Sequence, residues 1–328
     1  MARPGTGTAL GVVIVHPPPT NAVAFVDRQH GWAGGRGGLL GTTDGRTFRV
    51  EIRAPIIGIS AFDRARAWAI TADGFLLRTA DGRHWSRIGS PHLARVQFVD
   101  ARVGFGLTHD GVLMVSGNAG LSWVEARAPG LVQAECFVTR TRGWAARGGS
   151  VWSTRNGGRS WTLARLRRNP LALPELGCGD ADAWALFREG AAAGTEGYHV
   201  FRSLDGGPWR AVLASPFQQR LPTLSNYAGP FDVLGRGAAV FVGTCAPCDG
   251  VGTATIVRTL DGGRSFTRAT PFHGYTPSSV SFVDARRGWL LTSGHVASAS
   301  AVNSGVVWST TDGGRHWRVR YRSPLLGP

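Results

Sequence analysis

The sequence predicts an all-β protein, a β-propeller of seven four-stranded antiparallel blades with a tight turn between the third and fourth strands of each blade. Three observations predict this fold. One turn motif recurs seven times along the 328 residues, alternating apolar segments precede each copy, and glycine (47) and tryptophan (12) are abundant. Repeats of roughly 40 residues, each with four short strands, are typical of propeller blades.

The repeated turn reads Ser/Thr, a spacer, Asp or Asn, Gly-Gly, two spacers and an aromatic residue, as in residues 310–317. Asp or Asn can accept hydrogen bonds from the N–H groups of its own turn, and glycine adopts positive φ at little steric cost. We therefore interpret the turn as a structural corner. The first, second and fifth copies are one residue shorter than the full motif. The Asp/Asn positions are Asp44, Asp81, Asn118, Asn156, Asp205, Asp261 and Asp312.

A second pattern precedes each turn, namely a Phe-Val strand followed by a small residue and an aromatic residue. Residues 24–27 lead to Gly31-Trp32, and residues 281–284 lead to Gly288-Trp289. The sixth unit is degenerate, with residues 233–234 and 239–241 as its best match. Each unit therefore contains four predicted strands: the Phe-Val strand, the Gly-Trp strand, and the strands entering and leaving the turn.

The coupled patterns resemble the Asp-box (BNR) repeat found in sialidases, xyloglucan-degrading glycosidases, sortilin-type receptors and photosystem II stability and assembly factors. The pairing of Phe-Val-Asp and Gly-Trp with Thr-x-Asp-Gly-Gly-x-x-Trp is most similar to the assembly-factor-like propellers. The resemblance implies a propeller over residues 21–323, an N-terminal strand or linker over 1–20 and a tail over 324–328. It also implies an extracytoplasmic location, although residues 9–15 followed by prolines make a poor signal peptide.

The formal net charge of +15 comes entirely from arginine, since the sequence contains no lysine. Such a charge favours anionic partners. The arginines are nevertheless spread along the chain, which favours a bias of genome composition as their explanation. No nucleic-acid-binding module is recognisable, so nucleic acid is disfavoured, and a protein or glycan ligand of a monomeric protein is expected. No apolar run approaches the roughly 20 residues that span a bilayer.

The sequence predicts no cofactor and no metal site. Its four cysteines are Cys136, Cys178, Cys245 and Cys248. Cys245 and Cys248 have Cys-x-x-Cys spacing without a second such pair, so a local disulfide or two thiols are expected there. A metal site formed by Cys245, Cys248, His273 and His295 is geometrically feasible. It is not expected, because loop histidines are usually solvated. The disulfide state of all four cysteines stays undetermined at this stage.

The spacing of the turns locates the insertions. Successive Asp/Asn positions are 37, 37, 38, 49, 56 and 51 residues apart. From the second-strand aromatic residue to the Asp, the first unit takes 12 residues, the fifth 21 and the seventh 23. The connection between the second and third strands is thus predicted to be longer in blades 5–7, and the loop over residues 211–229 is also enlarged. Both kinds of connection lie on one face of a propeller, and insertions on one face of a repeat protein commonly mark the binding face.

The candidate binding residues lie in these connections, on the face opposite the repeated turns. They are Arg165, Arg167, Arg168, Arg188, Tyr198, Gln218, Arg220, Asn226, Tyr227, His273, Tyr275 and His295. The sequence favours a non-catalytic binding or assembly scaffold whose partner docks on this face of blades 5–7.

The alternative is a secreted glycoside hydrolase of sialidase-like or xyloglucanase-like type. Two facing carboxylic acids would be needed, and the candidates are Glu175, Glu189, Glu196 and Asp249. A sialidase also has a Phe/Tyr-Arg-Ile-Pro segment, which is absent here, and usually six blades rather than seven. Whether the chain is an enzyme is left open, with the scaffold preferred.

Overall fold

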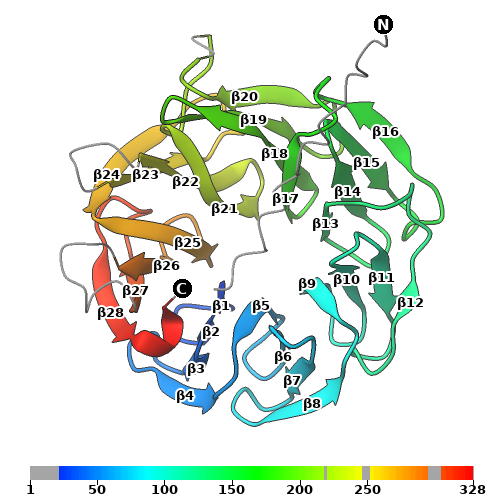
Figure 1. The fold of residues 1–328 in the computed structure, drawn as a ribbon, viewed down its shortest axis with the longest axis vertical. Helices are drawn as coiled ribbons and strands as arrows, with labels where there is room; N and C mark the ends of the chain where they lie inside the picture. The colour runs from blue at the N-terminus through cyan, green and yellow to red at the C-terminus, as the bar shows by residue number, and fades with distance from the viewer. Residues whose placement is uncertain (1–21, 218–219, 246–251, 295–303, 328) are drawn as a thin grey trace, which may run out of the picture.

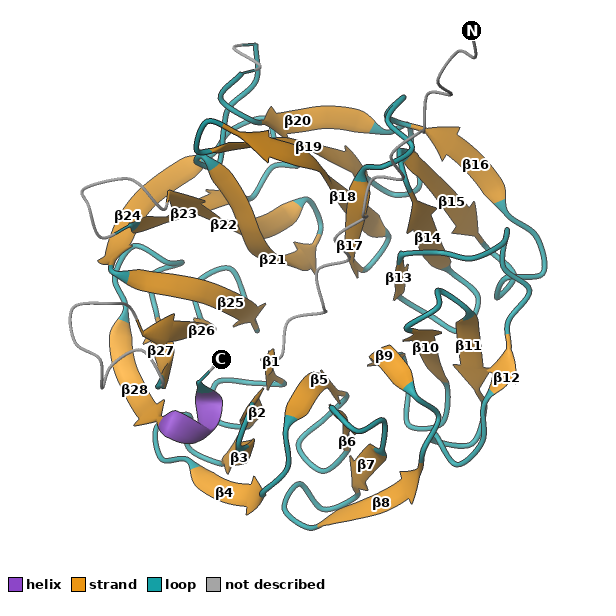
Figure 2. Cartoon of the chain, in the orientation of Figure 1, coloured by secondary structure: helices purple, strands orange, loops and turns teal. Residues whose placement is uncertain are grey.

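The computed structural model describes residues 22–217, 220–245, 252–294 and 304–327. These residues form seven four-stranded sheets arranged as blades around a central axis (Figures 1 and 2). Each sheet consists of four antiparallel strands that are consecutive in the sequence and paired in that order. The predicted seven-bladed β-propeller is confirmed.

Blades 1–4 are built from short strands. The elements of blades 1 and 2 are β1 (Ala22–Phe25), β2 (Gly31–Gly35), β3 (Gly38–Thr42), β4 (Arg49–Ile52), β5 (Ile56–Ala61), β6 (Ala67–Thr71), β7 (Leu76–Thr79) and β8 (Trp85–Gly89). Those of blades 3 and 4 are β9 (Leu93–Phe98), β10 (Gly104–Thr108), β11 (Leu113–Ser116), β12 (Val124–Glu125), β13 (Ala134–Phe137), β14 (Gly143–Arg147), β15 (Ser150–Thr154) and β16 (Thr162–Arg165).

Blades 5–7 have longer strands. Blades 5 and 6 contain β17 (Leu173–Gly179), β18 (Asp182–Ala192), β19 (Thr195–Ser203), β20 (Arg210–Ala214), β21 (Tyr227–Gly235), β22 (Ala238–Cys245), β23 (Thr253–Thr259) and β24 (Thr267–His273). Blade 7 contains β25 (Tyr275–Phe282), β26 (Gly288–Gly294), β27 (Gly305–Thr310) and β28 (Arg318–Ser323). In the described part of the chain, the one helical element is the 3₁₀ turn η2 (Pro324–Leu326), and no helix there is long and apolar enough to cross a membrane.

Aromatic stacking explains the two sequence patterns of the inner strands. The Phe25 ring of β1 stacks on Trp289 of the preceding blade, with centroids 3.7 Å apart, and Phe98 stacks on Trp68 at 3.6 Å. A Cβ atom at Gly31 would lie 2.4 Å from the Phe25 ring. Glycine before the second-strand tryptophan therefore leaves room for the phenylalanine that packs against the neighbouring blade.

Polar side chains on the inner strands also link adjacent blades. The Ser60 hydroxyl of β5 accepts a hydrogen bond from the Phe98 N–H at 2.8 Å, and Gln97 Oε1 of β9 accepts one from the Phe137 N–H at 2.8 Å. In both cases the acceptor belongs to one blade and the donor to the inner strand of the next. These bonds satisfy backbone groups at the inner edges of the sheets.

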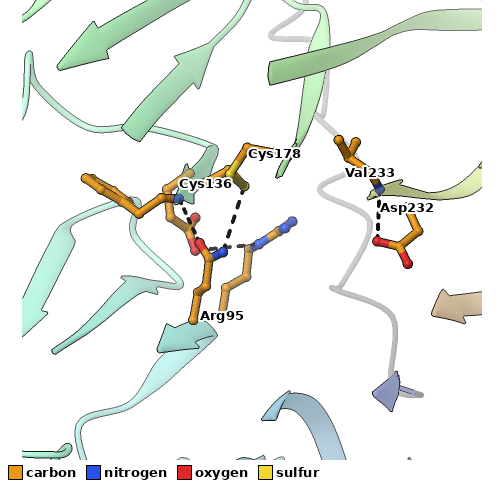
Figure 3. Close-up of a disulfide and its surroundings, with 8 residues drawn as sticks. Arg95, Cys136, Cys178, Asp232 and Val233 are labelled. Atoms are coloured by element: carbon orange, nitrogen blue, oxygen red, sulfur yellow. Dashed lines mark hydrogen bonds and ion pairs between the residues drawn. A yellow bond between two sulfur atoms is a disulfide. The ribbon is translucent and has the colours of Figure 1, made fainter. Parts of the chain in front are cut away.

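A disulfide takes this position between blades 4 and 5. Cys136 of β13 is bonded to Cys178 of β17 (Figure 3). Cys136 precedes Phe137 as Gln97 precedes Phe98, so the disulfide occupies the site of the inter-blade hydrogen bond. The state of this pair, which the sequence left open, is thereby defined. Cys248 lies outside the described residues.

The repeated turns fold as predicted in six of seven copies. In the seventh, Asp312 Oδ1 accepts the N–H groups of Arg315 and His316 at 3.1 and 3.0 Å, and the Thr310 hydroxyl donates to the same oxygen. The copies with Asp44, Asp81, Asn118, Asn156 and Asp261 likewise accept at least one N–H of their own turn.

The fifth copy departs from this prediction. Asp205 has a φ of 49°, and its carboxylate accepts no described hydrogen bond from its own turn. Instead, its N–H donates to Asp182 Oδ1 at 3.2 Å. The physical reason is Pro208. In the equally short first copy, Asp44 accepts the N–H groups two and three residues further on, whereas the third residue after Asp205 is Pro208, which has no N–H to donate.

The C-terminal segment, predicted to be a tail, packs between the last and first blades. Leu326 is fully buried in a cluster with Val23 of blade 1 and Val307 of blade 7. The Gly37 N–H donates to the Leu325 carbonyl at 2.9 Å. The ring is thus held closed by η2 in addition to the contacts between β1 and β25. The predicted N-terminal strand or linker over residues 1–20 lies outside the described part.

Candidate functional site

The long-loop face is the face formed by the connections between second and third strands and by the connections between blades. Its most prominent element is the β18–β19 hairpin of blade 5, whose strands pair out to Ala192 and Thr195. Ala193 and Gly194, both with positive φ, form the two-residue turn. The sequence predicted a longer loop here. In the structure the extra residues extend the strands instead.

The insertion between blades 5 and 6 packs firmly against this hairpin. We call its described residues, 215–217 and 220–226, the strap. The Tyr198 hydroxyl accepts the N–H groups of Leu224 and Ser225 at 2.8 and 3.3 Å, and Arg268 Nη1 donates to the Leu224 carbonyl at 3.0 Å. Leu224 is fully buried in the core of blades 5 and 6. The strap is therefore fixed at its centre.

Tyr198 is accordingly a structural residue rather than an exposed binding residue. Its side chain is fully buried, and its hydroxyl donates to the Ser225 carbonyl at 2.8 Å. Burial raises the pKa of this phenol, so it stays protonated near neutral pH. The placement corrects the prediction that Tyr198 contributes to the binding face, because alternation along β19 points this side chain inward.

Arg188 connects the hairpin to blade 6. Its Nη1 donates to Glu175 at 2.8 Å, its Nε lies 3.7 Å from Glu196, and its Nη2 donates to the Ala228 carbonyl at 3.2 Å. Glu196 in turn accepts the Ala228 N–H at 3.0 Å. Two of the candidate carboxylates are thus both paired with Arg188.

A second group, Arg167, Glu189 and His199, lies on the same hairpin. Arg167 forms two hydrogen bonds to Glu189, whose carboxylate also lies 3.4 Å from His199 Nδ1. Burial and the nearby charge of Arg167 lower the pKa of His199, against the opposing effect of Glu189. His199 is therefore neutral at pH 7, and the ion pair of Arg167 with Glu189 dominates the group.

These contacts bear on the hydrolase alternative. A glycosidase needs two carboxyl groups that face an open gap, about 5–10 Å apart, across the scissile bond. Glu175, Glu189 and Glu196 are instead each paired with an arginine, and the fourth candidate, Asp249, lies outside the described residues. Among the described residues, all three of these candidate glutamates are thus engaged by an arginine.

The remaining predicted binding residues differ in exposure. Arg165, Arg168, Arg220 and His273 are exposed, whereas Tyr227 and Tyr275 are half-buried. Asn226 binds the hairpin turn, donating to the Gly194 carbonyl and the Thr195 hydroxyl. Gln218 and His295 lie outside the described part, and among the described residues no three potential ligands are placed to hold a metal ion.

Two exposed apolar residues on this face were not predicted. Leu171, in the connection between blades 4 and 5, is 73% exposed, and Phe217 of the strap is 63% exposed. Large apolar side chains this exposed often belong to interaction surfaces when they lie together with polar neighbours. The sequence feature that could have indicated them is their position in inserted or inter-blade segments.

The inner strands carry one buried acid without a complete set of partners. Glu135 of β13 is 4% exposed, its Oε1 lies 3.8 Å from Arg95 Nε, and its Oε2 has no hydrogen-bond partner (Figure 3 shows Arg95 beside the disulfide). Burial raises the pKa of this carboxyl, and the Arg95 charge only partly opposes the effect. The charged form is therefore costly at this position.

Replacing Glu135 with glutamine is expected to increase the free energy of unfolding at pH 7, because burial raises the pKa of this carboxyl and the neutral amide avoids the cost of burying its charge. A raised carboxyl pKa stabilises the folded state below the unfolded-state pKa, and this stability is lost as pH rises through the folded-state pKa. Urea unfolding from pH 4 to 8 should thus show a weaker pH dependence in E135Q. The exposed Glu125→Gln serves as the control, and equal pH profiles for the two variants would contradict the expectation.

Comparison with known proteins supports the fold. No family model and no curated protein matches the sequence. A propeller described as YCF48 bound to D1 peptide superimposes with a TM-score of 0.59 at 15% identity, covering 90% of this chain and 94% of that one. The GH74 enzyme of Niastella koreensis gives 0.64 at 12% identity, covering 93% of this chain but only 54% of that one. The WD40 propeller domain of Doa1 gives 0.54 at 12% identity, with 94% of each chain covered.

At these identities the likeness is one of fold. The chain spans about half of the length of the GH74 enzyme, and that enzyme's chemistry does not transfer with the architecture. The similar structures include a protein bound to a peptide, a GH74 enzyme and a WD40 domain, so a shared fold here does not specify a function. The comparisons thus place this chain among the β-propellers.

Proposed function

We propose that this protein is a non-catalytic binding scaffold that docks a protein partner on the long-loop face of blades 5–7. The observation that carries the proposal is the exposure of Phe217 on the strap and of Leu171 in the connection between blades 4 and 5, while the candidate acids are held in ion pairs. Rigid loops with exposed apolar residues suit binding, because little conformational entropy is lost on association.

The partner's chemistry follows from the surroundings of these residues. Arg165, Arg168 and Arg220 are exposed on the same face. A face that carries both exposed apolar side chains and arginines suits a peptide segment with large apolar side chains and acidic neighbours. A propeller of the same fold that is described as bound to a peptide is consistent with this mode.

The surface variant Leu171→Ser/Phe217→Ser is expected to weaken binding about tenfold or more. Ligands would first be found by screening the purified protein against arrays of acidic, apolar-containing peptides and of glycans, and the affinities then measured by calorimetry. Leu260→Ser is the matched control, because Leu260 is 51% exposed but lies in a repeated turn on the opposite face. Equal losses in both variants would contradict the assignment of the face.

The hydrolase alternative is tested on the same preparation. Turnover of a sialoside, a β-glucan or xyloglucan that disappears in Glu189→Gln or Glu175→Gln would overturn the scaffold proposal. We expect no turnover with any of these substrates, because a carboxylate held by arginine is poorly placed to donate a proton.

A further inference from the structure

A cavity opens on the face of the repeated turns, between blades 4 and 5, opposite the proposed partner site. Its volume is about 170 Å³. The side chains that define its chemistry are Arg142, Trp144, Arg155, Thr162, Ser203 and Trp209. The cavity lining thus contains two guanidinium groups, two indoles and hydroxyl groups, and no acidic residue.

Arg142 lacks the carboxylate that its counterpart in blade 2 has. There, Asp63 accepts the N–H of Arg66 at 2.7 Å and pairs with its guanidinium at 2.8 Å. Blade 4 has Thr139 at the aspartate position, and the Thr139 hydroxyl accepts the Arg142 N–H at 3.0 Å. The backbone turn is preserved while the negative charge is lost.

Arg142 and Arg155 approach the same point. A Cβ atom at Gly206 would lie 2.8 Å from Arg142 Nη2 and 3.0 Å from Arg155 Nη2. Arg142 also donates to the Ala181 carbonyl at 3.1 Å and lies over the Trp144 ring at 5.7 Å. Among the described residues neither arginine forms an ion pair. Two like charges therefore converge without compensation, which is unfavourable unless an anion joins them.

The irregular fifth turn explains why the space is open. In the regular turns the Ser/Thr hydroxyl accepts a glycine N–H, as Thr154 does from Gly158 at 2.9 Å. In the fifth copy the Ser203 hydroxyl donates to the Gly207 carbonyl at 2.6 Å instead. Gly206 and Gly207 of this turn line the cavity and contribute no side chain that would fill it.

We propose that this cavity is an oxyanion site, which binds a carboxylate, sulfate or phosphate group between Arg142 and Arg155. Guanidinium groups form strong charge-assisted hydrogen bonds to such oxygens, and the Thr162 and Ser203 hydroxyls lie in the same lining. The indoles of Trp144 and Trp209 supply an apolar wall for the group that carries the anion. This site is independent of the long-loop face.

The test measures anion binding by calorimetry and by thermal shift, with sodium sulfate, sodium phosphate and sodium acetate compared with sodium chloride at equal ionic strength. Arg155→Gln is the main variant, because Arg155 is exposed and has no described structural bond. Arg159→Gln is the matched control, since it removes the same charge from the same turn outside the cavity.

Saturable binding that is about tenfold weaker in R155Q and unchanged in R159Q supports the proposal. Saturation by phosphate or sulfate indicates an inorganic or esterified anion, whereas saturation by acetate alone indicates a carboxylate-bearing ligand. No saturation by any of the three anions, or equal losses in R155Q and R159Q, would overturn it. The general stabilisation that sulfate gives to proteins persists in every variant and is thereby separated from site binding. The variant Leu171→Ser/Phe217→Ser should leave anion binding unchanged. The proposed anion site and the proposed partner face are therefore tested independently of each other.

Discussion

Replacing Leu224 with alanine is expected to lower the free energy of unfolding by about 2–5 kcal/mol, the usual range for a fully buried leucine. Leu224 is the side chain by which the strap enters the core of blades 5 and 6, where it packs with Trp184, Val200 and Phe241. Truncation leaves a cavity that the hydrogen bonds around the Tyr198 hydroxyl prevent from collapsing freely. Denaturant unfolding, followed by tryptophan fluorescence, measures the loss.

The same substitution should also loosen the proposed partner site, because Leu224 anchors the strap that carries Phe217. Hydrogen–deuterium exchange of the strap is expected to rise in L224A well beyond that of blades 1–4. Leu171→Ala is the control for stability, since this leucine is 73% exposed and its loss should change the unfolding free energy by less than about 0.5 kcal/mol. An L224A protein as stable as L171A would show that the strap is not anchored by this side chain.

Much of the fold follows from local packing requirements that are recognisable as sequence patterns. The glycine of Gly31-Trp32 is required by the ring of Phe25, and that ring stacks on the tryptophan of the preceding blade. The same stacking recurs between blades 2 and 3 and between blades 3 and 4. The seven turn positions and the four-strand order could therefore be predicted without tertiary information.

The sequence predicted where the candidate site lies but not which of its side chains are exposed. The spacing of the turns placed the insertions in blades 5–7 on one face, and the long β18–β19 hairpin lies there. Which side chains face outward depends on how far pairing continues, and that is decided by contacts with blade 6. Thus Tyr198 points into the core, and Glu196 pairs with Arg188 and with the Ala228 N–H. Such choices are made by tertiary packing rather than by local propensity.

The fifth turn was misread for a related reason. Asp205 keeps the motif residue, but the shortened segment with Pro208 cannot present the two N–H groups that an aspartate there would accept. The sequence did contain this signal, in the proline at position 208. Its consequence, the cavity beside Arg142 and Arg155, depends on the absence of a carboxylate at Thr139 in the neighbouring blade.

Reduction of the Cys136–Cys178 disulfide is expected to lower the free energy of unfolding by about 2–4 kcal/mol. The two cysteines are separated by 42 residues, about one repeat, so the bond joins corresponding inner strands of blades 4 and 5. Neighbouring blade pairs use a single hydrogen bond at this place, such as that from the Phe137 N–H to Gln97. A net contribution near 1 kcal/mol is usual for such a bond. The disulfide is thus the strongest single inter-blade link among the described inner strands.

Urea unfolding with and without a phosphine reductant measures this contribution, with free thiols counted to verify reduction. The double variant Cys136→Ala/Cys178→Ala should match the reduced protein and should lose most of the sensitivity to reductant. An unchanged unfolding free energy after verified reduction of this pair would contradict the expectation. Because disulfides persist in oxidising compartments, we further propose that the protein works outside the cytoplasm. On that proposal, protein made in an oxidising compartment should contain the bond, and protein made in a reducing one should have the lower stability of the double variant.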